Sequence, residues 1–325
     1  MFVLYCSNYF PLLPNKPTHS HLLVKRRCHG RCRLFFYIVV LCILWVDQTE
    51  KGLSALTQIK LIASDLDHTL LTEAGTLPPH FYDEIRALHN QGIHFVAASG
   101  RAIYTLKPMF EPVKDCMSLV GENGAVVIRN GKIVYSQFLP KADYVRLIQH
   151  TRTLGLGVPL LCALDASYID EQYAQYADNL RHFITELRVV PDITQLDVDV
   201  PKYTVYYPNG GLTDVYERDY VQPLGDQFHV TVGGSEFLDI MHRVVNKGHA
   251  LSELGGLLDV TPDEMITFGD NLNDIEMLKL AGHSYIMQAA TKAIEPYATA
   301  RIGSNGEYAV AEKIQSVLDQ HGVLV

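Results

Sequence analysis

The chain has 325 residues, of which 48% are hydrophobic and 19% are charged. This length allows two domains, and the composition is typical of a globular protein with a large apolar core. The formal net charge of -9 argues against a nucleic-acid-binding protein, because a phosphate backbone is bound through basic patches.

The first 57 residues differ from the rest of the chain. They contain seven Lys and Arg residues against two acids, a net charge of +5, which leaves -14 on the remainder. A basic stretch at 25–33 precedes the apolar run 34–46, as in a signal sequence or a membrane anchor. That run has thirteen residues, whereas a bilayer-spanning helix needs about 20. Three interpretations stay open: a start site assigned too far upstream, a membrane tether, and a disordered tail. We favour the first, with translation starting at Leu56, which predicts a cytoplasmic protein with no membrane partner.

Two carboxylates, Asp65 and Asp67, follow the apolar run 59–64, and Thr69 comes next. The run is typical of a buried parallel strand, whose last residues emerge at the carboxyl edge of a sheet, where open α/β folds place their chemistry. Two acids crowded there repel each other unless a cation neutralises them. A hard ion that prefers oxygen ligands, such as Mg²⁺, is the expected occupant. Alone, the pattern also suits helix-capping or solvated acids.

Further polar residues follow in the order that phosphate chemistry needs. They are Ser99 and Gly100 after the apolar run 94–98, Lys247 at the start of an amphipathic helix, and Asp270, Asn273 and Asp274 after the apolar run 265–268. A hydroxyl and the N–H groups of a Gly-containing turn can approach a phosphoryl oxygen. Four such segments in this order indicate a phosphate-handling site.

These segments resemble the motifs of the haloacid dehalogenase superfamily, and within it those of the Cof-type phosphatases, which carry a large cap of the second, B-type class. The resemblance covers roughly residues 58–325 and includes the run 121–125 (Gly-Glu-Asn-Gly-Ala) and the C-terminal stretch 289–298. One departure is His68, where the family usually has Gly. We expect altered packing of the loop there and no loss of activity.

The resemblance implies a doubly wound, Rossmann-like parallel sheet with an inserted α+β cap. The apolar runs and helical periodicities alternate as such a fold requires. We expect the first part of the core at 58–138, the cap at 139–234 and the second part of the core at 235–325. In the family the cap is a lid over the active site.

By the same resemblance, Asp65 is the nucleophile that forms an aspartyl-phosphate. Asp67 is the general acid that protonates the leaving group and then the base that activates water. Mg²⁺ would be held by Asp65, by the backbone carbonyl of Asp67 and by Asp270, with Asp274 supporting its water ligands. The phosphoryl group would be bound by the remaining polar residues of the motifs: Lys247, Thr69, Ser99, Gly100 and Asn273, the last of which orients either Lys247 or the phosphoryl group.

Some other polar residues are candidates for substrate contact. Arg101 either contacts the substrate or pairs with an acid of the core. Asn123 is expected in a turn near the site. In the cap, Asp165, Ser167 and Tyr168 follow an apolar strand and form either an ordinary polar loop or a leaving-group contact.

Lys202 is the alternative to Lys247 as the lysine of the site. It begins an apolar strand of the cap, and a lysine on a strand usually belongs to a solvated face. We therefore favour Lys247, which stands at the mouth of a helix within the core.

The predicted function is that of a Mg²⁺-dependent phosphomonoesterase for small metabolites, such as sugar phosphates or the phosphates of flavin or pyridoxal cofactors. One alternative is a phosphomutase. The other is a phospho-acceptor or binding module in which Asp65 is phosphorylated but slowly hydrolysed. The presence of Asp67, which would hydrolyse that intermediate, disfavours the phospho-acceptor.

Overall fold

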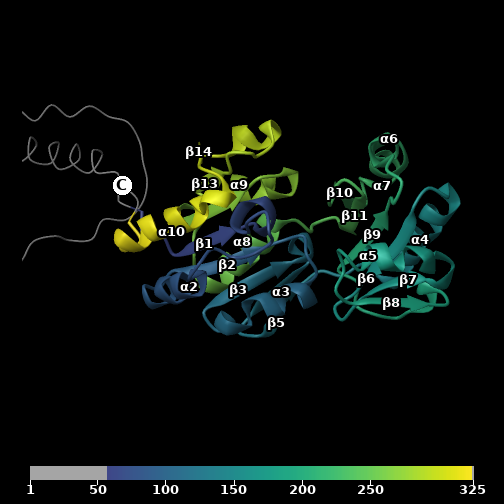
Figure 1. Cartoon of the computed structure of the whole chain (residues 1–325), viewed down its shortest axis with the longest axis horizontal. Helices are drawn as coiled ribbons and strands as arrows, with labels where there is room; N and C mark the ends of the chain where they lie inside the picture. The colour runs from purple at the N-terminus through teal and green to yellow at the C-terminus, as the bar shows by residue number, and fades with distance from the viewer. Residues whose placement is uncertain (1–56, 324–325) are drawn as a thin grey trace, which may run out of the picture. The chain divides into compact units, whose positions relative to one another are not determined.

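The computed structural model describes residues 57–323 (Figure 1). The predictions made for residues 1–56, namely the start site, the membrane tether and the disordered tail, lie outside these described residues. Within residues 57–323 we find no helix that is both long and apolar enough to cross a membrane.

The larger of the two sheets in the described part of the chain has eight strands in the order β14-β13-β12-β1-β2-β3-β4-β5. Its strands are β1 (Leu61–Ser64), β2 (His94–Ala98), β3 (Met117–Gly121), β4 (Val126–Arg129), β5 (Lys132–Ser136), β12 (Met265–Gly269), β13 (His283–Ile286) and β14 (Ala300–Arg301). Six of them run parallel, and β4 and β5 are antiparallel additions at one edge. The central strand β1 is buried throughout, as its apolar sequence predicts.

Helices cover both faces of this sheet, so the predicted doubly wound fold is confirmed. One face is covered by α2 (Phe81–Asn90), α3 (Ile103–Phe110) and α10 (Ala309–Asp319), and the other by α8 (Lys247–Leu258) and α9 (Ile275–Leu280). Alternate residues of a strand point to opposite faces. Accordingly, Ile62 of β1 packs with residues of α2, α3 and α10 in a first apolar cluster. Leu61 packs with residues of α8 and α9 in a second apolar cluster on the other face.

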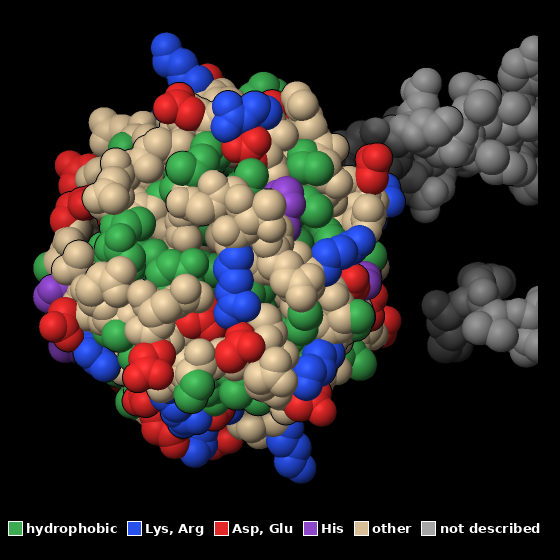
Figure 2. Space-filling view, turned by 90° about the vertical axis from the view of Figure 1, so that its right-hand side faces the viewer, with side chains coloured by type: hydrophobic (Ala, Val, Ile, Leu, Met, Phe, Trp, Pro, Cys, Tyr) green, Lys and Arg blue, Asp and Glu red, His purple; other side chains and the backbone are tan. Residues whose placement is uncertain are grey.

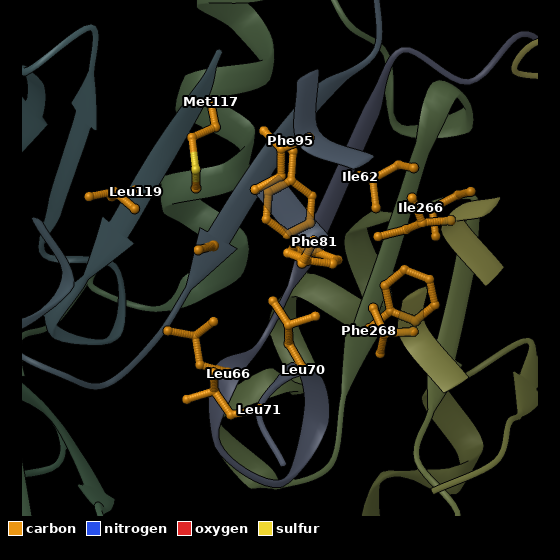
Figure 3. Close-up of a cluster of buried hydrophobic side chains, with 14 of the residues drawn as sticks. Ile62, Leu66, Leu70, Leu71, Phe81, Phe95, Met117, Leu119, Ile266 and Phe268 are labelled. Carbon is orange, nitrogen blue, oxygen red and sulfur yellow. The ribbon is translucent and has the colours of Figure 1, made fainter. Parts of the chain in front are cut away.

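Figure 3 shows part of the first cluster. Phe95 of β2 meets Phe81 of α2 edge to face, with ring centroids 5.4 Å apart. Ile266 and Phe268 of β12 lie in the same cluster. Burial of each such side chain contributes about 1.5–3 kcal/mol, so this cluster fixes β1, β2 and β12 side by side and sets the edge at which they end.

The segment between β5 and α8 forms a second sheet of six strands in the order β10-β11-β9-β6-β7-β8. Its strands are β6 (Val158–Cys162), β7 (Ser167–Asp170), β8 (Leu187–Val190), β9 (Lys202–Tyr206), β10 (Phe228–Val232) and β11 (Phe237–His242). One face packs on α4 (Lys141–Leu154) and on the short helices α6 (Leu212–Val215) and α7 (Gln222–Leu224). The other face packs on α5 (Ala177–Leu180). We call this segment the insert.

The surface of the insert carries charges of both signs. Figure 2 looks onto this side of the molecule, where Lys and Arg side chains intermingle with Asp and Glu. Exposed pairs such as Arg181 with Asp178, 2.9 Å apart, contribute about 1 kcal/mol at most. The insert is therefore held together mainly by its two apolar clusters.

The insert differs from its sequence-based description in two places. The predicted end at residue 234 falls inside a hairpin, because β11 pairs with both β9 and β10. The polar loop predicted over 165–168 is also wrong in part. Ser167 and Tyr168 belong to β7 and pair with β6. The chain already reverses before them, in a tight turn in which the Ala163 N–H donates a hydrogen bond to the Ala166 carbonyl.

Candidate active site

Three parallel neighbours of the larger sheet end at one edge and deliver polar residues there. Asp65 follows β1, Ser99 follows β2 and Asp270 follows β12. Lys247, the first residue of α8, reaches the same edge. The structure therefore brings together the motifs that the sequence identified separately, as expected for the carboxyl ends of strands in an open α/β sheet.

Lys247 lies at the centre of an acidic cluster. Its side chain has no exposed surface, and its Nζ donates to Asp65 Oδ1 at 2.5 Å and to Asp274 Oδ1 at 2.7 Å. Carboxylate oxygens of Asp65, Asp270 and Asp274 all lie within 4.8 Å of one another. Thr69 Oγ1 donates to Asp270 Oδ1 at 3.1 Å. We call Asp65, Asp270, Asp274 and Lys247 the acidic cluster.

Local sequence explains how Lys247 reaches this position. The side chain of Asn246 caps α8 by accepting from the His249 N–H at 2.7 Å. Gly248 then allows close contact between α8 and α9, because a Cβ there would collide with the backbone of Glu276. A larger residue would move the first turn of α8, and Lys247 with it, away from the acids.

Asp274 is held from two sides. Its Oδ2 accepts from the backbone N–H groups of Asp270 and Asn271, at 2.9 and 3.1 Å, while Oδ1 accepts from Lys247. Such bonds fix the loop after β12. They also fit the predicted supporting role, since both carboxylate oxygens already have protein partners.

The cluster carries more negative than positive charge. Burial raises the pKa of Asp65 well above its ordinary value, and Asp274 and Asp270 add to this while Lys247 opposes it. Burial and the neighbouring Asp274 also raise the pKa of Asp270. Burial disfavours the charged form of Lys247, but Asp274 and Asp65 outweigh it and raise the pKa of that lysine. Close-set carboxylate oxygens with unbalanced charge fit a hard divalent cation such as Mg²⁺.

Asp67 has a different environment from Asp65. Its side chain is 49% exposed, against 8% for Asp65. Arg101 donates to both of its oxygens, from Nε to Oδ2 at 2.9 Å and from Nη2 to Oδ1 at 2.5 Å. Of the two predicted positions for Arg101, the structure shows the pair with a core acid. An exposed carboxylate beside a buried one could exchange protons with solvent or with a leaving group.

Ser99 and Gly100 form a turn held by neighbours from both parts of the chain. Ser99 is buried, and its Oγ accepts from the Arg101 N–H at 3.1 Å. The Gly100 carbonyl accepts from Lys202 Nζ at 2.9 Å. The solvated position favoured for Lys202 is wrong, since the residue is only 8% exposed.

The two candidate asparagines contact each other. Asn273 Nδ2 donates to Asn123 Oδ1 at 3.1 Å, and Asn123 Nδ2 donates to Asp239 Oδ2 at 3.2 Å. Asn123 lies in the turn after β3, as predicted, with a φ of 55°. Asn273 therefore links the loop after β12 to this turn.

The candidates in the insert form a separate group. Tyr168 donates its hydroxyl to Asp165, and Arg188 Nη1 donates to Asp165 Oδ2 at 2.7 Å and to the Tyr168 hydroxyl at 2.9 Å. Ser167 instead contacts the core, with its Oγ 2.9 Å from the Tyr104 hydroxyl. These hydrogen bonds give Asp165, Ser167 and Tyr168 a structural role. A contact between these residues and the substrate remains a prediction.

Two buried acids were not identified from the sequence. Glu122 and Asp239 both lie 3.3 Å from Lys202 Nζ. The signal for Asp239 was a charged residue inside the apolar strand 237–241, because an acid in such a strand needs a buried partner. Glu122 lies in the Gly-Glu-Asn-Gly-Ala run, and its φ of 52° marks an unusual backbone for a non-glycine residue.

Comparison with known proteins places this chain in a family. The model of the haloacid dehalogenase-like hydrolases matches residues 62–314. The Escherichia coli protein named 5-amino-6-(5-phospho-D-ribitylamino)uracil phosphatase YbjI is 29% identical over 262 residues, which cover 80% of this chain and 96% of that protein.

Solved structures agree. SMU.1108c from Streptococcus mutans has a TM-score of 0.73 at 27% identity, covering 80% of this chain and 99% of that one. A haloacid dehalogenase-like hydrolase from Bacteroides thetaiotaomicron, at 24% identity, shares the fold with a TM-score of 0.71 over 80% of this chain and 100% of that one. The chain therefore belongs to the haloacid dehalogenase-like hydrolase family and is a phosphatase of that family.

Proposed function

We propose that this chain is a Mg²⁺-dependent phosphomonoesterase that cleaves small phosphorylated metabolites through an aspartyl-phosphate on Asp65. The observation that carries the proposal is the acidic cluster at the carboxyl edge of the sheet. There Lys247 bonds Asp65 and Asp274 while Asp270 lies beside them. A nucleophilic carboxylate, a fixed cation and a place for a divalent ion are the components that phosphoryl transfer needs.

In the first proposed step, an oxygen of Asp65 bonds to phosphorus while the bond from phosphorus to the leaving oxygen breaks. Asp67 gives its proton to that leaving oxygen. In the second step, Asp67 takes a proton from water, the water oxygen bonds to phosphorus, and the bond to Asp65 breaks, which regenerates the carboxylate and releases phosphate. The greater exposure of Asp67 suits a group that must meet both an alcohol and water.

The remaining residues would bind and orient the phosphoryl group. Lys247 and the turn of Ser99 and Gly100 supply donors at the edge where Asp65 ends, and Thr69 fixes Asp270. A divalent cation held by Asp65, Asp270 and the Asp67 carbonyl would offset charge between the carboxylates and the phosphoryl oxygens.

The relatives support the substrate class that we propose. The Escherichia coli relative is named for a phosphate ester of a ribityl side chain on a uracil, which supports the flavin-related part of the sequence prediction. We therefore propose 5-amino-6-(5-phospho-D-ribitylamino)uracil and sugar phosphates as the first substrates to assay. We also propose that the enzyme acts in the cytoplasm. The insert would cover the substrate and select among leaving groups.

The decisive experiment compares Asp65→Asn with Asp67→Asn in single-turnover reactions with Mg²⁺. Asp65→Asn should abolish turnover of every substrate, because an amide cannot form the aspartyl-phosphate. Asp67→Asn should slow the first step about 10²–10⁴-fold on a sugar phosphate. It should slow p-nitrophenyl phosphate much less, because p-nitrophenolate leaves without a proton. Phosphorylated Asp65 should accumulate, since water is no longer activated.

Two results would contradict the proposal. Equal first-step losses on both substrates, with no trapped phosphorylated protein, would mean that Asp67 is not the general acid. Full activity in excess chelator would remove the divalent cation from the mechanism. Single-turnover rates are needed, because steady-state turnover of Asp67→Asn would be limited by the second step for both substrates.

A further inference from the structure

A buried lysine of the insert bonds to the backbone of the proposed phosphate-binding turn. Lys202 begins β9, and its Nζ donates to the Gly100 carbonyl of the core at 2.9 Å. The two residues are 102 positions apart in sequence. Sequence patterns around either residue give no sign of this contact, which exists only because the insert packs on the core.

One acid of the core and one acid of the insert keep Lys202 charged and in place. Glu122 of the core and Asp239 of the insert each lie 3.3 Å from its Nζ. Burial disfavours the charge, but Asp239 and Glu122 outweigh it and raise the pKa of Lys202. Thr204 Oγ1 in turn donates to Asp239 Oδ1 at 2.6 Å, so the acid that holds the lysine is itself fixed.

The bond to Gly100 acts on one peptide group. The carbonyl that accepts from Lys202 belongs to the same peptide as the Arg101 N–H, which donates to Ser99 Oγ at 3.1 Å. A cation on the carbonyl polarises this peptide and strengthens its N–H as a donor. Ser99 Oγ then accepts from the backbone, which leaves its own hydrogen to donate to a phosphoryl oxygen.

A second residue, Asn123, also contacts the turn. A Cβ on Gly100 would lie 2.8 Å from Asn123 Oδ1, so the turn already touches this side chain. Asn123 donates to Asp239 at 3.2 Å and accepts from Asn273 at 3.1 Å. Gly100 therefore contacts both Lys202 and Asn123, and these two residues contact the same acid of the insert, Asp239.

We infer that Lys202 is a positioning residue for phosphoryl transfer, which acts through the Gly100 carbonyl to orient the hydroxyl of Ser99. This inference rests on the proposed function, because it assumes that Ser99 binds the phosphoryl group. It gives the insert a part in the phosphate-binding turn in addition to any contact with the leaving group.

The test is a double-mutant cycle of Lys202→Met with Ser99→Ala in the full chain with Mg²⁺, measuring kcat/KM and inhibition by inorganic phosphate. Each single variant should lower kcat/KM on the order of 10- to 100-fold and weaken phosphate inhibition. In the Ser99→Ala background, Lys202→Met should lower kcat/KM further by less than about 3-fold, because the two residues act through one bond.

The matched control is Arg152→Met. Arg152 Nη2 lies 2.8 Å from Asp170 Oδ2, a carboxylate buried in the insert, so this variant also strands a buried acid, but away from Gly100. It should lower the melting temperature as Lys202→Met does, yet keep kcat/KM and phosphate inhibition near the wild-type values.

The outcomes separate the inference from the proposed function. If Ser99→Ala is unimpaired, the phosphate-binding role of Ser99 fails, and the inference fails with it. If Ser99→Ala is impaired but Lys202→Met adds its full loss on top, only the inference is overturned. If Lys202→Met does not fold, the double variant Lys202→Met/Asp239→Asn is measured instead, because it removes the stranded charge of Asp239. A folded double variant with wild-type kcat/KM would also overturn the inference.

Discussion

Replacing Lys247 by Met should destabilise the protein strongly, because this substitution removes a fully buried cation from between two acids. Its Nζ bonds Asp65 and Asp274 at 2.5 and 2.7 Å. Removing one partner of a buried ion pair costs about 3–5 kcal/mol. With about 2–4 °C in melting temperature for each kcal/mol in a domain of this size, we expect a loss of roughly 6–20 °C.

The measurement is thermal unfolding at pH 7, followed by circular dichroism, with chelator present and then with Mg²⁺. Saturating Mg²⁺ should stabilise the Lys247→Met variant by more than it stabilises the wild type. In the variant, the bound Mg²⁺ would replace the positive charge that Lys247 supplies between the carboxylates. A ligand at 100 times its Kd adds about 2.7 kcal/mol, which would restore much of the loss.

Two further variants serve as controls. Lys60 pairs with Glu264 at 2.6 Å, but its side chain is 45% exposed, so Lys60→Met should cost at most about 1 kcal/mol. Adding Asp274→Asn to Lys247→Met should recover part of the lost stability, because one stranded charge disappears. A loss for Lys247→Met no larger than that for Lys60→Met, with no recovery in the double variant, would refute the electrostatic account of the cluster.

Two other predictions concern stability. Burial lowers the pKa of His94 to about 4, so below pH 6.5 the unfolded chain takes up a proton before the folded one does. Stability from this group is present above pH 6.5 and lost as the pH falls to about 4, by up to about 3 kcal/mol. Urea unfolding should show a shallower acid loss for His94→Gln, and an unchanged slope would reject the assignment. His68 has a φ of 59° and a ψ of 6°, a left-handed backbone that costs a side-chain-bearing residue about 1–2 kcal/mol. After allowing for the extra freedom of Gly in the unfolded chain, His68→Gly should raise the free energy of unfolding by about 0.5–1 kcal/mol, and a clear loss would contradict this.

The sequence was most informative where chemistry follows directly from strand position. The runs before Asp65, Ser99 and Asp270 are continuous and apolar, so each predicts a buried strand, and parallel strands end at one edge. The contacts of Asp65 and Asp270 in the acidic cluster are the geometric outcome of that rule. The Gly that the family usually has in place of His68 also has a local explanation, since the left-handed backbone there favours Gly.

The sequence was least informative where a partner comes from another part of the chain. Lys202 was assigned to a solvated face because β9 looks like an ordinary strand of the insert. That strand lies between β11 and β6, and its first residue points at Gly100 of the core. Periodicity describes one strand at a time, whereas the partners of Lys202 come from two parts of the core and one of the insert.

The same limitation applies to Asp65 and Asp67, whose spacing makes them look equivalent. Tertiary contacts distinguish them: Asp65 is buried against Lys247, and Asp67 is half exposed and paired with Arg101. A carboxylate held against a buried cation has a fixed direction of approach, which suits a nucleophile. A carboxylate near solvent can gain and lose a proton, although it must first leave or share its arginine. The difference in environment, and not the spacing, is what makes separate roles for the two acids chemically reasonable.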